Sequence, residues 1–440
     1  MKEVKPTSNT NPQSPAHNLR LRRAQRDQVT PVPARLDALL PEDHLARLIW
    51  QAVTRLDLSA FYAGVVVEED GRGQAATDPM LLIALWLYAT SQGVTSARAL
   101  ARLCVEHLAY IWLCGGVSMN YHTLSDFRVR HGAALDTLLT QVLGHLIHAG
   151  LVEFEHTAQD GMRVRASAGA ASFHRQGTLE KALEQARALV AALESPTGSE
   201  EERPTAREEA ARTRAARERV QRLEAALAEM PAAQAAKPEA EQEKARVSNT
   251  DPEARVMKMA DGGFRPAYNW EFAVDTAHRV ITGVEVVNIG SDKAQMPPMI
   301  DQVKDRCKQL PKDWLIDGGF VSTPAIEAGT AQGLRILAPV PKPKNPARDP
   351  HVPLLSDSPV IGAWRERMGT EEAKATYKLR AATAECVNGQ ARTCYQVQQV
   401  RVRGRAKVLC VARWVAITHD IIIWLKHWAS PVAMPAACDA

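Results

Sequence analysis

The chain changes composition abruptly between residues 178 and 244, which consist mostly of Ala, Glu, Arg, Gln and Leu. Apolar side chains recur there at helical spacing in two stripes, which are separated by the turn at 195–198 and by Pro204. That pattern predicts two antiparallel helices, a hairpin or short coiled coil, as an insertion over residues 173–246. The insertion is either a solvated spacer within a loop or an arm for dimerisation or for contact with DNA.

Strand and helix patterns alternate outside this insertion. Residues 155–168 have the alternation of a strand, with Asp160 and Gly161 in its middle. After the insertion the sequence predicts a hairpin (270–276 with 280–288), a helix (296–310) and two buried strands (314–320 and 334–340). A proline-rich loop (339–353), a helix (371–392) and an aliphatic segment (408–428) follow. That order is typical of a three-layer α/β domain with a mixed sheet, which we place at 151–172 and 247–430.

The segment before the first strand is predicted to be a separate helical domain over residues 31–150. This domain contains a pattern that resembles a helix-turn-helix: a helical run that begins at Ser96, a break at Gly115 and a capped helix that begins at Tyr121. A helix-turn-helix places its second helix in the major groove of DNA. Plain helical packing produces the same pattern. A flexible tail is expected at each end, over 1–30 and 431–440, and the first of them is basic, with Arg20, Arg22, Arg23 and Arg26.

Composition excludes several classes of protein. Hydrophobic residues make up 45% of the chain and charged residues 24%, as in ordinary globular proteins, and no apolar run approaches the roughly 18 residues of a membrane span. The N-terminus lacks the pattern of a signal peptide, and the seven cysteines form no CxxC pair, so we expect a cytoplasmic protein with reduced thiols. The net charge of +4 permits a nucleic-acid partner. Basic side chains gather near the C-terminus at Arg401, Arg403, Arg405, Lys407 and Arg413.

Three acidic residues are distinguished by their positions among the 50 Asp and Glu of the chain. Asp160 lies in the first predicted strand, Asp317 ends a later strand before two glycines, and Glu385 lies in the helix after the last strand. Acids at strand ends can converge with a helix-borne acid at one edge of a sheet. Carboxylate oxygens suit Mg²⁺ or Mn²⁺, and a pair of such ions can promote displacement at phosphorus. An active trio therefore predicts metal dependence and weak activity at acid pH.

Other polar residues allow two interpretations each. Asp275, at the end of a predicted strand, is a competing candidate for a metal ligand, although an acid at that position also caps the following turn. Arg265, Tyr268 and Asn269 precede the same strand and either contact DNA or form an ordinary polar loop.

At these residues the chain resembles the DDE transposases of bacterial insertion sequences, over most of its length from residue 31 to about 428. The matching blocks, in order, are GVTSARALARLCVEHLAYIWLCGG with YHTLSDFRVRH, then QDGMRVRASAG, DGGFRPAYNWEFAVDT, LIDGGF and YKLRAATAECVNGQAR. The resemblance implies an RNase H-like catalytic core in which Asp160, Asp317 and Glu385 bind divalent metal, with two Mg²⁺ or Mn²⁺ ions expected.

The family's signature around the glutamate corresponds here to Tyr377, Arg380, Glu385 and Arg392. With the resemblance, we predict that Tyr377, Arg380, Asn388 and Arg392 bind DNA. Seven residues are nearly two helical turns, so Glu385, Asn388 and Arg392 should share one face, where Arg392 can meet DNA phosphate. Two departures stand out. Arginine replaces the family's usual lysine at 392, and the spacing from Arg380 to Glu385 is one residue longer than in the common signature.

The function implied is metal-dependent cleavage at the terminal inverted repeats of a transposon, followed by strand transfer into target DNA. Double-stranded DNA is the expected partner, with the N-terminal domain recognising the element's ends and the basic segment over 401–407 holding phosphates. A homodimer or higher oligomer follows from the need to bring two ends together. The alternatives are an RNase H-like nuclease without strand transfer and an inactive or domesticated DNA-binding protein derived from a transposase.

Overall fold

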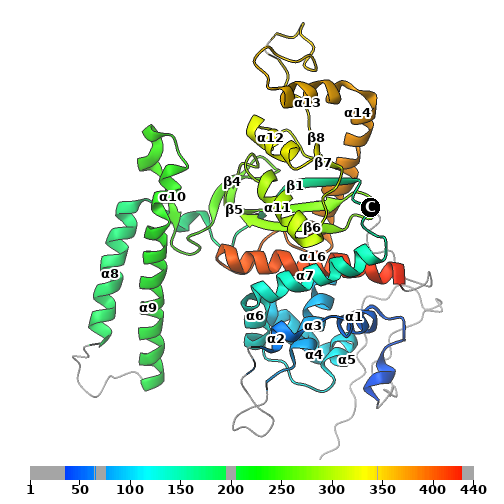
Figure 1. Ribbon diagram of the computed structural model, residues 1–440. Helices are drawn as coiled ribbons and strands as arrows, with labels where there is room; N and C mark the ends of the chain where they lie inside the picture. The colour runs from blue at the N-terminus through cyan, green and yellow to red at the C-terminus, as the bar shows by residue number, and fades with distance from the viewer. Residues whose placement is uncertain (1–34, 64, 66–75, 195–204, 344, 429–440) are drawn as a thin grey trace, which may run out of the picture.

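The computed structural model describes residues 35–63, 65, 76–194, 205–343 and 345–428 (Figure 1). The tails expected over 1–30, with its four arginines, and over 431–440 lie outside the described residues. The described chain is a mixed α/β protein, as its sequence predicts, and its sheet is curled.

The N-terminal segment is helical. Its elements are η1 (Leu36–Leu39), α1 (Leu45–Val53), α2 (Ser59–Tyr62), α3 (Pro79–Ser91), α4 (Ala97–Glu106), α5 (Leu108–Cys114), α6 (Tyr121–Arg130) and α7 (Gly132–His148). The run that begins at Ser96 is two helices, because His107 ends α4 and its ring nitrogen accepts a hydrogen bond from the Ala109 amide to cap α5. The glycine break is present, since Gly115 and Gly116 both have positive φ after α5. Asn120 then caps α6 through the amide of His122.

A six-stranded mixed sheet follows. Its strands are β1 (His156–Arg165), β4 (Arg255–Lys258), β5 (Phe264–Asp275), β6 (Ile281–Val287), β7 (Asp313–Leu315) and β8 (Arg335–Leu337). The order is β4-β5-β1-β7-β8, and β6 pairs with β5 as the predicted hairpin. Strand β1 runs antiparallel to β5 and parallel to β7, while β7 runs parallel to β8. One half of the sheet is therefore a parallel β1-β7-β8 unit, and it is joined to an antiparallel half.

Helices cover both faces of the sheet. They are α11 (Met296–Cys307), α12 (Thr323–Ala331), α13 (Pro359–Gly369), α14 (Glu371–Tyr377), α15 (Cys386–Thr393) and α16 (Arg405–Trp428), with a π-helical turn over Ala381–Glu385 between α14 and α15. Helix α11 lies directly on β6, where a β-carbon at Gly283 would stand 2.5 Å from the Met299 sulfur. Only a glycine permits that approach.

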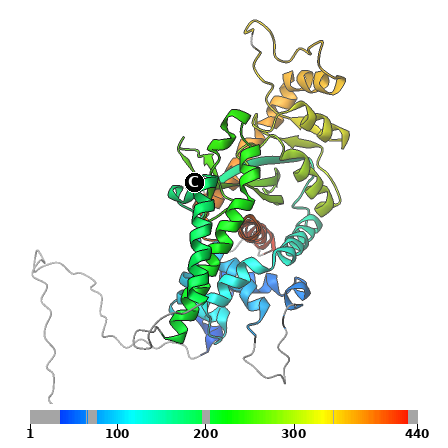
Figure 2. The same cartoon turned by 90° about the vertical axis from the view of Figure 1, so that its left-hand side faces the viewer.

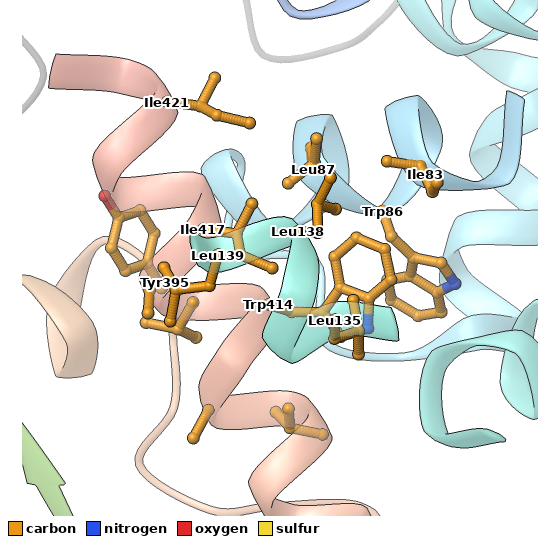
Figure 3. Close-up of a cluster of buried hydrophobic side chains, with 14 of the residues drawn as sticks. Ile83, Trp86, Leu87, Leu135, Leu138, Leu139, Tyr395, Trp414, Ile417 and Ile421 are labelled. Atoms are coloured by element: carbon orange, nitrogen blue, oxygen red, sulfur yellow. The ribbon is translucent and has the colours of Figure 1, made fainter. Parts of the chain in front are cut away.

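Helix α16 joins the sheet to the N-terminal helices. It packs against β6 on one side and against α3, α6 and α7 on the other. Figure 3 shows Trp414 and Ile417 of this helix among Trp86, Leu135 and Leu138. One continuous core contains all of these side chains together with Trp270 and Phe272 of β5, so the expected domain boundary near residue 150 does not coincide with a division of the core.

Helix α16 is long and apolar enough over Arg405–His427 to span a membrane, although no run of that length is expected from the sequence. However, 78% of its most apolar window is buried inside the protein. The burial is that of a core helix, and it explains why the aliphatic segment near the C-terminus is so apolar.

The insertion forms the helical hairpin that its composition predicts. It contains α8 (Gln176–Glu194), α9 (Ala206–Ala228), α10 (Met230–Ala235) and η4 (Glu239–Lys244), and at its base η2 (Ala170–Ser172) precedes β2 (Phe173–His174), which pairs with β3 (Val247–Ser248). In Figure 1 the α8–α9 pair stands beside the body of the molecule, and Figure 2 shows the two helices side by side along their length. A small core of its own holds the hairpin together, including Leu179, Leu183, Leu223 and Met230.

Candidate active site

Strand register places the first two predicted acids next to each other. The parallel pairing of β1 with β7 matches His156 with Asp313 and Ala158 with Leu315. Extending that register by two residues brings Asp160 opposite Asp317, which lies just beyond the end of β7. The two carboxyl groups are close enough for Asp317 to raise the pKa of Asp160 by charge repulsion. This proximity arises from the topology of the sheet, since 157 residues separate the two acids in the sequence.

Arg380 links Asp160 to the third predicted acid. Its Nη2 donates to Glu385 Oε1 at 2.8 Å, and its Nη1 lies 3.6 Å from Asp160 Oδ1. The Arg380 side chain is only 14% exposed, whereas that of Glu385 is 57% exposed. The guanidinium group therefore balances the negative charge of two of the three acids from a mostly buried position.

Asn388 and Tyr377 complete the surroundings. The Nδ2 of Asn388, on α15, donates to Asp160 Oδ2 at 3.0 Å, so this predicted DNA-binding residue instead contacts a predicted catalytic carboxylate. Tyr377, also predicted to meet DNA, is half-buried and interacts with Arg380, and burial raises the pKa of its phenol. Arg392 lies in the last turn of α15 and is half-buried.

A π-helical turn accounts for the unusual spacing of the signature. In an α-helix, residues five apart point about 140° away from each other, at 3.6 residues per turn. The segment between Arg380 and Glu385 is instead π-helical over Ala381–Glu385, a wider turn that holds one additional residue. The extra residue is thereby absorbed, and Arg380 and Glu385 face each other within hydrogen-bond distance.

The carboxyl group of Asp160 is strongly perturbed. Burial raises its pKa to about 6, Arg380 lowers it, Asp317 raises it, and hydrogen bonds from the Gly161 amide and Asn388 lower it. Desolvation of the ionised form is the largest of these effects. A buried carboxyl that ionises near neutral pH beside a second acid is a typical candidate for a functional group.

The arrangement in the structure is not a closed metal cage. Among the described residues, no group of three or more His, Cys, Asp or Glu side chains is placed to hold a metal ion. The Arg380 guanidinium contacts both Asp160 and Glu385. The side chains fit divalent metal in their chemistry, because their free atoms are carboxylate oxygens gathered around a positive charge. Holding an ion between Asp160 and Glu385 requires Arg380 to move aside.

The predicted basic segment is anchored through its backbone. The amides of Gly404 and Arg405 donate to Asp251 and Glu253 at 3.0 and 2.9 Å. Arg401 and Arg403 remain exposed, although the Nε of each contacts the body, at Thr95 and at the Ser167 carbonyl. The other exposed cations of the segment are Arg405 and Lys407. These side chains are available to an anionic partner.

Arg413 belongs to the core instead of this basic segment. It pairs with Asp136 at 2.9 Å and donates to the Gly132 carbonyl, so it ties α16 to α7.

Two of the alternative DNA contacts are buried. Tyr268 and Asn269 are 0% exposed, and the Tyr268 hydroxyl donates to Asp251. Neither can contact DNA in this conformation, because strand β5 begins earlier than predicted and includes both. Arg265 is half-buried and pairs with Asp261. Asp275 accepts a hydrogen bond from the Ala277 amide at 3.0 Å, the turn-capping role that was the alternative to metal ligation.

Sequence reasoning missed a second polar cluster beside Asp160. It consists of Gln159, Arg163, Asn269, Glu271 and Asp292. The signal for it was present in the period-two alternation of β5, where Asn269 and Glu271 alternate with Tyr268, Trp270 and Phe272. That alternation indicates one polar face, but not that the face is buried.

Comparison with known proteins adds one finding. The family described as "Transposase domain (DUF772)" matches residues 34–130, which include η1 to α6. No curated protein matches the chain, and no solved structure matches it. The match supports a transposase family for this protein and, with it, a role in transposition and DNA as a partner. It lies in the helical segment and does not reach Asp160, Asp317 or Glu385.

Proposed function

We propose that the protein is a DDE transposase with an RNase H-like core, which cleaves the ends of a mobile element and joins them to target DNA. The observation that carries the proposal is that Arg380 contacts Asp160 and Glu385, while strand register places Asp317 opposite Asp160 on the neighbouring parallel strand. The transposase domain matched at residues 34–130 independently supports a transposase, although it does not reach these acids.

The three acids would hold the metal, as two Mg²⁺ or Mn²⁺ ions. Bound there, such ions stabilise the charge that develops on phosphodiester oxygens during displacement at phosphorus. Asn388 orients Asp160 through its hydrogen bond, and Arg380 keeps the carboxylates together before the metal binds. When Arg380 moves aside, its guanidinium becomes available to a DNA phosphate.

The remaining cations would hold DNA. Arg392 follows Glu385 by seven residues and lies close to its face of the helix. Arg401, Arg403, Arg405 and Lys407 supply exposed charge for sequence-independent contacts with phosphates. Recognition of the terminal inverted repeats belongs to the N-terminal helices, and synapsis of two ends calls for a homodimer or higher oligomer.

The test is cleavage and end joining of a labelled duplex that carries the element's own terminal repeat, with Mg²⁺ or Mn²⁺. Asp160→Asn, Asp317→Asn and Glu385→Gln should each abolish both reactions while DNA binding persists. Asp305→Asn, which changes an exposed acid on α11, is the matched control and should remain active.

Each other outcome selects a different function. Cleavage without joining indicates an RNase H-like nuclease. Binding without cleavage under both metals indicates a DNA-binding protein derived from a transposase. Full activity of Glu385→Gln would show that the proposed ligand set is wrong.

A further inference from the structure

Three oxygen atoms converge on the place where residue 161 has no side chain. A β-carbon built at Gly161 would stand 2.9 Å from Glu271 Oε1, 3.0 Å from Asn269 Oδ1 and 3.0 Å from Asp292 Oδ1. Gly161 pairs directly with Glu271 across the β1–β5 ladder, and Asn269 lies two residues earlier on the same face of β5. Asp292 reaches the point from the loop between β6 and α11. The point is open because residue 161 is glycine.

These oxygens belong to buried groups. Asn269 and Glu271 are 0% exposed and Asp292 is 7% exposed. Arg163 Nη2 lies 3.0 Å from Asp292 Oδ2, so its guanidinium balances the charge of the Asp292 carboxylate. Burial together with the neighbouring Asp292 raises the pKa of Glu271, which favours the protonated carboxyl group. A cation bound here would displace that proton and meet two carboxylates that are balanced by one guanidinium.

The carboxamide of Asn269 gives an independent indication of a ligand. Its Nδ2 donates to Glu271 Oε1 and Asp292 Oδ1, at 2.6 Å each. Its Oδ1, which faces the open point, has no hydrogen-bond partner although it is buried. A buried acceptor in a folded protein normally has a donor or a cation opposite it.

We propose that Asn269, Glu271 and Asp292 bind one divalent cation in this cradle at Gly161, separate from the Asp160, Asp317 and Glu385 site. The ligands are all oxygen atoms, the set that hard cations such as Ca²⁺, Mn²⁺ and Mg²⁺ prefer. A β-carbon is bonded to its α-carbon, so an ion would lie beyond the place of a β-carbon at Gly161, on the side of the three oxygens.

The cradle also adjoins the candidate active site. Asp292 Oδ2 lies 3.3 Å from the place of a β-carbon at Gly319, and Asp317 Oδ1 lies 2.9 Å from the same place. Gly161 directly follows Asp160 on β1, so the Asp160 side chain points to the face of the strand opposite the cradle. A cation in the cradle would therefore fix the backbone beside Asp160 and the loop that carries Asp317.

The test counts bound ions in a protein in which the three predicted catalytic acids have been replaced by neutral amides. The background is the full chain with Asp160→Asn, Asp317→Asn and Glu385→Gln, titrated with Mn²⁺ alone and followed by the paramagnetic resonance of free Mn²⁺. We expect one ion to remain bound. Adding Glu271→Gln should weaken its binding at least tenfold, whereas Glu285→Gln, on the partner residue of the neighbouring strand, should leave it unchanged.

Gly161→Ala supplies a second variant, because the added methyl group fills the cradle while every ligand remains. It should abolish binding of the ion and its stabilisation of the protein in thermal melting, and a melt without metal checks that the variant is folded. Absence of a bound ion in the triple background, or unchanged affinity after both Glu271→Gln and Gly161→Ala, would overturn the proposal. Neither result depends on whether the wild-type protein cuts DNA, so the two proposals fail separately.

Discussion

Replacing Asp160 with asparagine should stabilise the protein at neutral pH. Folding raises the pKa of this carboxyl from 3.8 to about 6, chiefly by burial. The folded state therefore binds the proton more tightly than the unfolded state does. At about 1.4 kcal/mol for each tenfold change in proton affinity, ionised Asp160 costs about 3 kcal/mol of folding free energy.

The dependence on pH follows from the sign of this shift. The cost is absent below pH 3.8, grows as the pH rises to about 6, and is complete above that value. Asp160→Asn removes the cost while its side-chain oxygen can still accept the hydrogen bond from Asn388. Its stabilising effect should be near zero at pH 4 and reach about 3 kcal/mol at pH 7.5.

The assay is denaturant unfolding in chelator, followed by tryptophan fluorescence, for wild type and Asp160→Asn between pH 4 and 8. Asp305→Asn serves as the control, because an exposed acid should give no such trend. A destabilised Asp160→Asn at pH 7.5, or a difference that does not vary with pH, would refute the reasoning that burial dominates at this site.

Three further predictions follow from the site and the core. Cleavage at Mn²⁺ concentrations well below saturation should weaken as the pH falls through about 6, because the proton competes with the metal for Asp160, and a pH–rate profile under these conditions that stays flat to pH 5 would contradict this. Deleting Ala382 should turn the π-helical segment into an ordinary helix and leave cleavage within about tenfold of wild type, while deleting Cys386 should abolish it by rotating Asn388 away from Asp160. Trp414→Ala should cost about 3 to 5 kcal/mol and lower the stability of the N-terminal helices and the sheet together, visible as one shifted transition by circular dichroism, whereas two separate transitions would mean that α16 does not unite them.

Local sequence patterns determined much of the fold. Helical periodicity and turn residues predicted the α8–α9 hairpin, strand-forming residues predicted β5 and β6, and a short apolar run before a glycine turn predicted the buried strand before Asp317. These signals lie within a few residues of each other, so the sequence carries them without knowledge of what packs where. The same positions, read with the resemblance to DDE transposases, selected Asp160, Asp317 and Glu385, whose catalytic role stays a prediction.

Tertiary structure decided what those residues meet. The contact of Arg380 with two acids depends on a π-helical turn, which the spacing alone showed only as an irregularity. The burial of Asn269 and Glu271 depends on which face of β5 is covered by α11 and the loop before it. The shared core around α16 depends on helices that are more than 250 residues apart in the chain. Periodicity shows which face of an element is polar, but the long-range packing of other elements determines whether water reaches it.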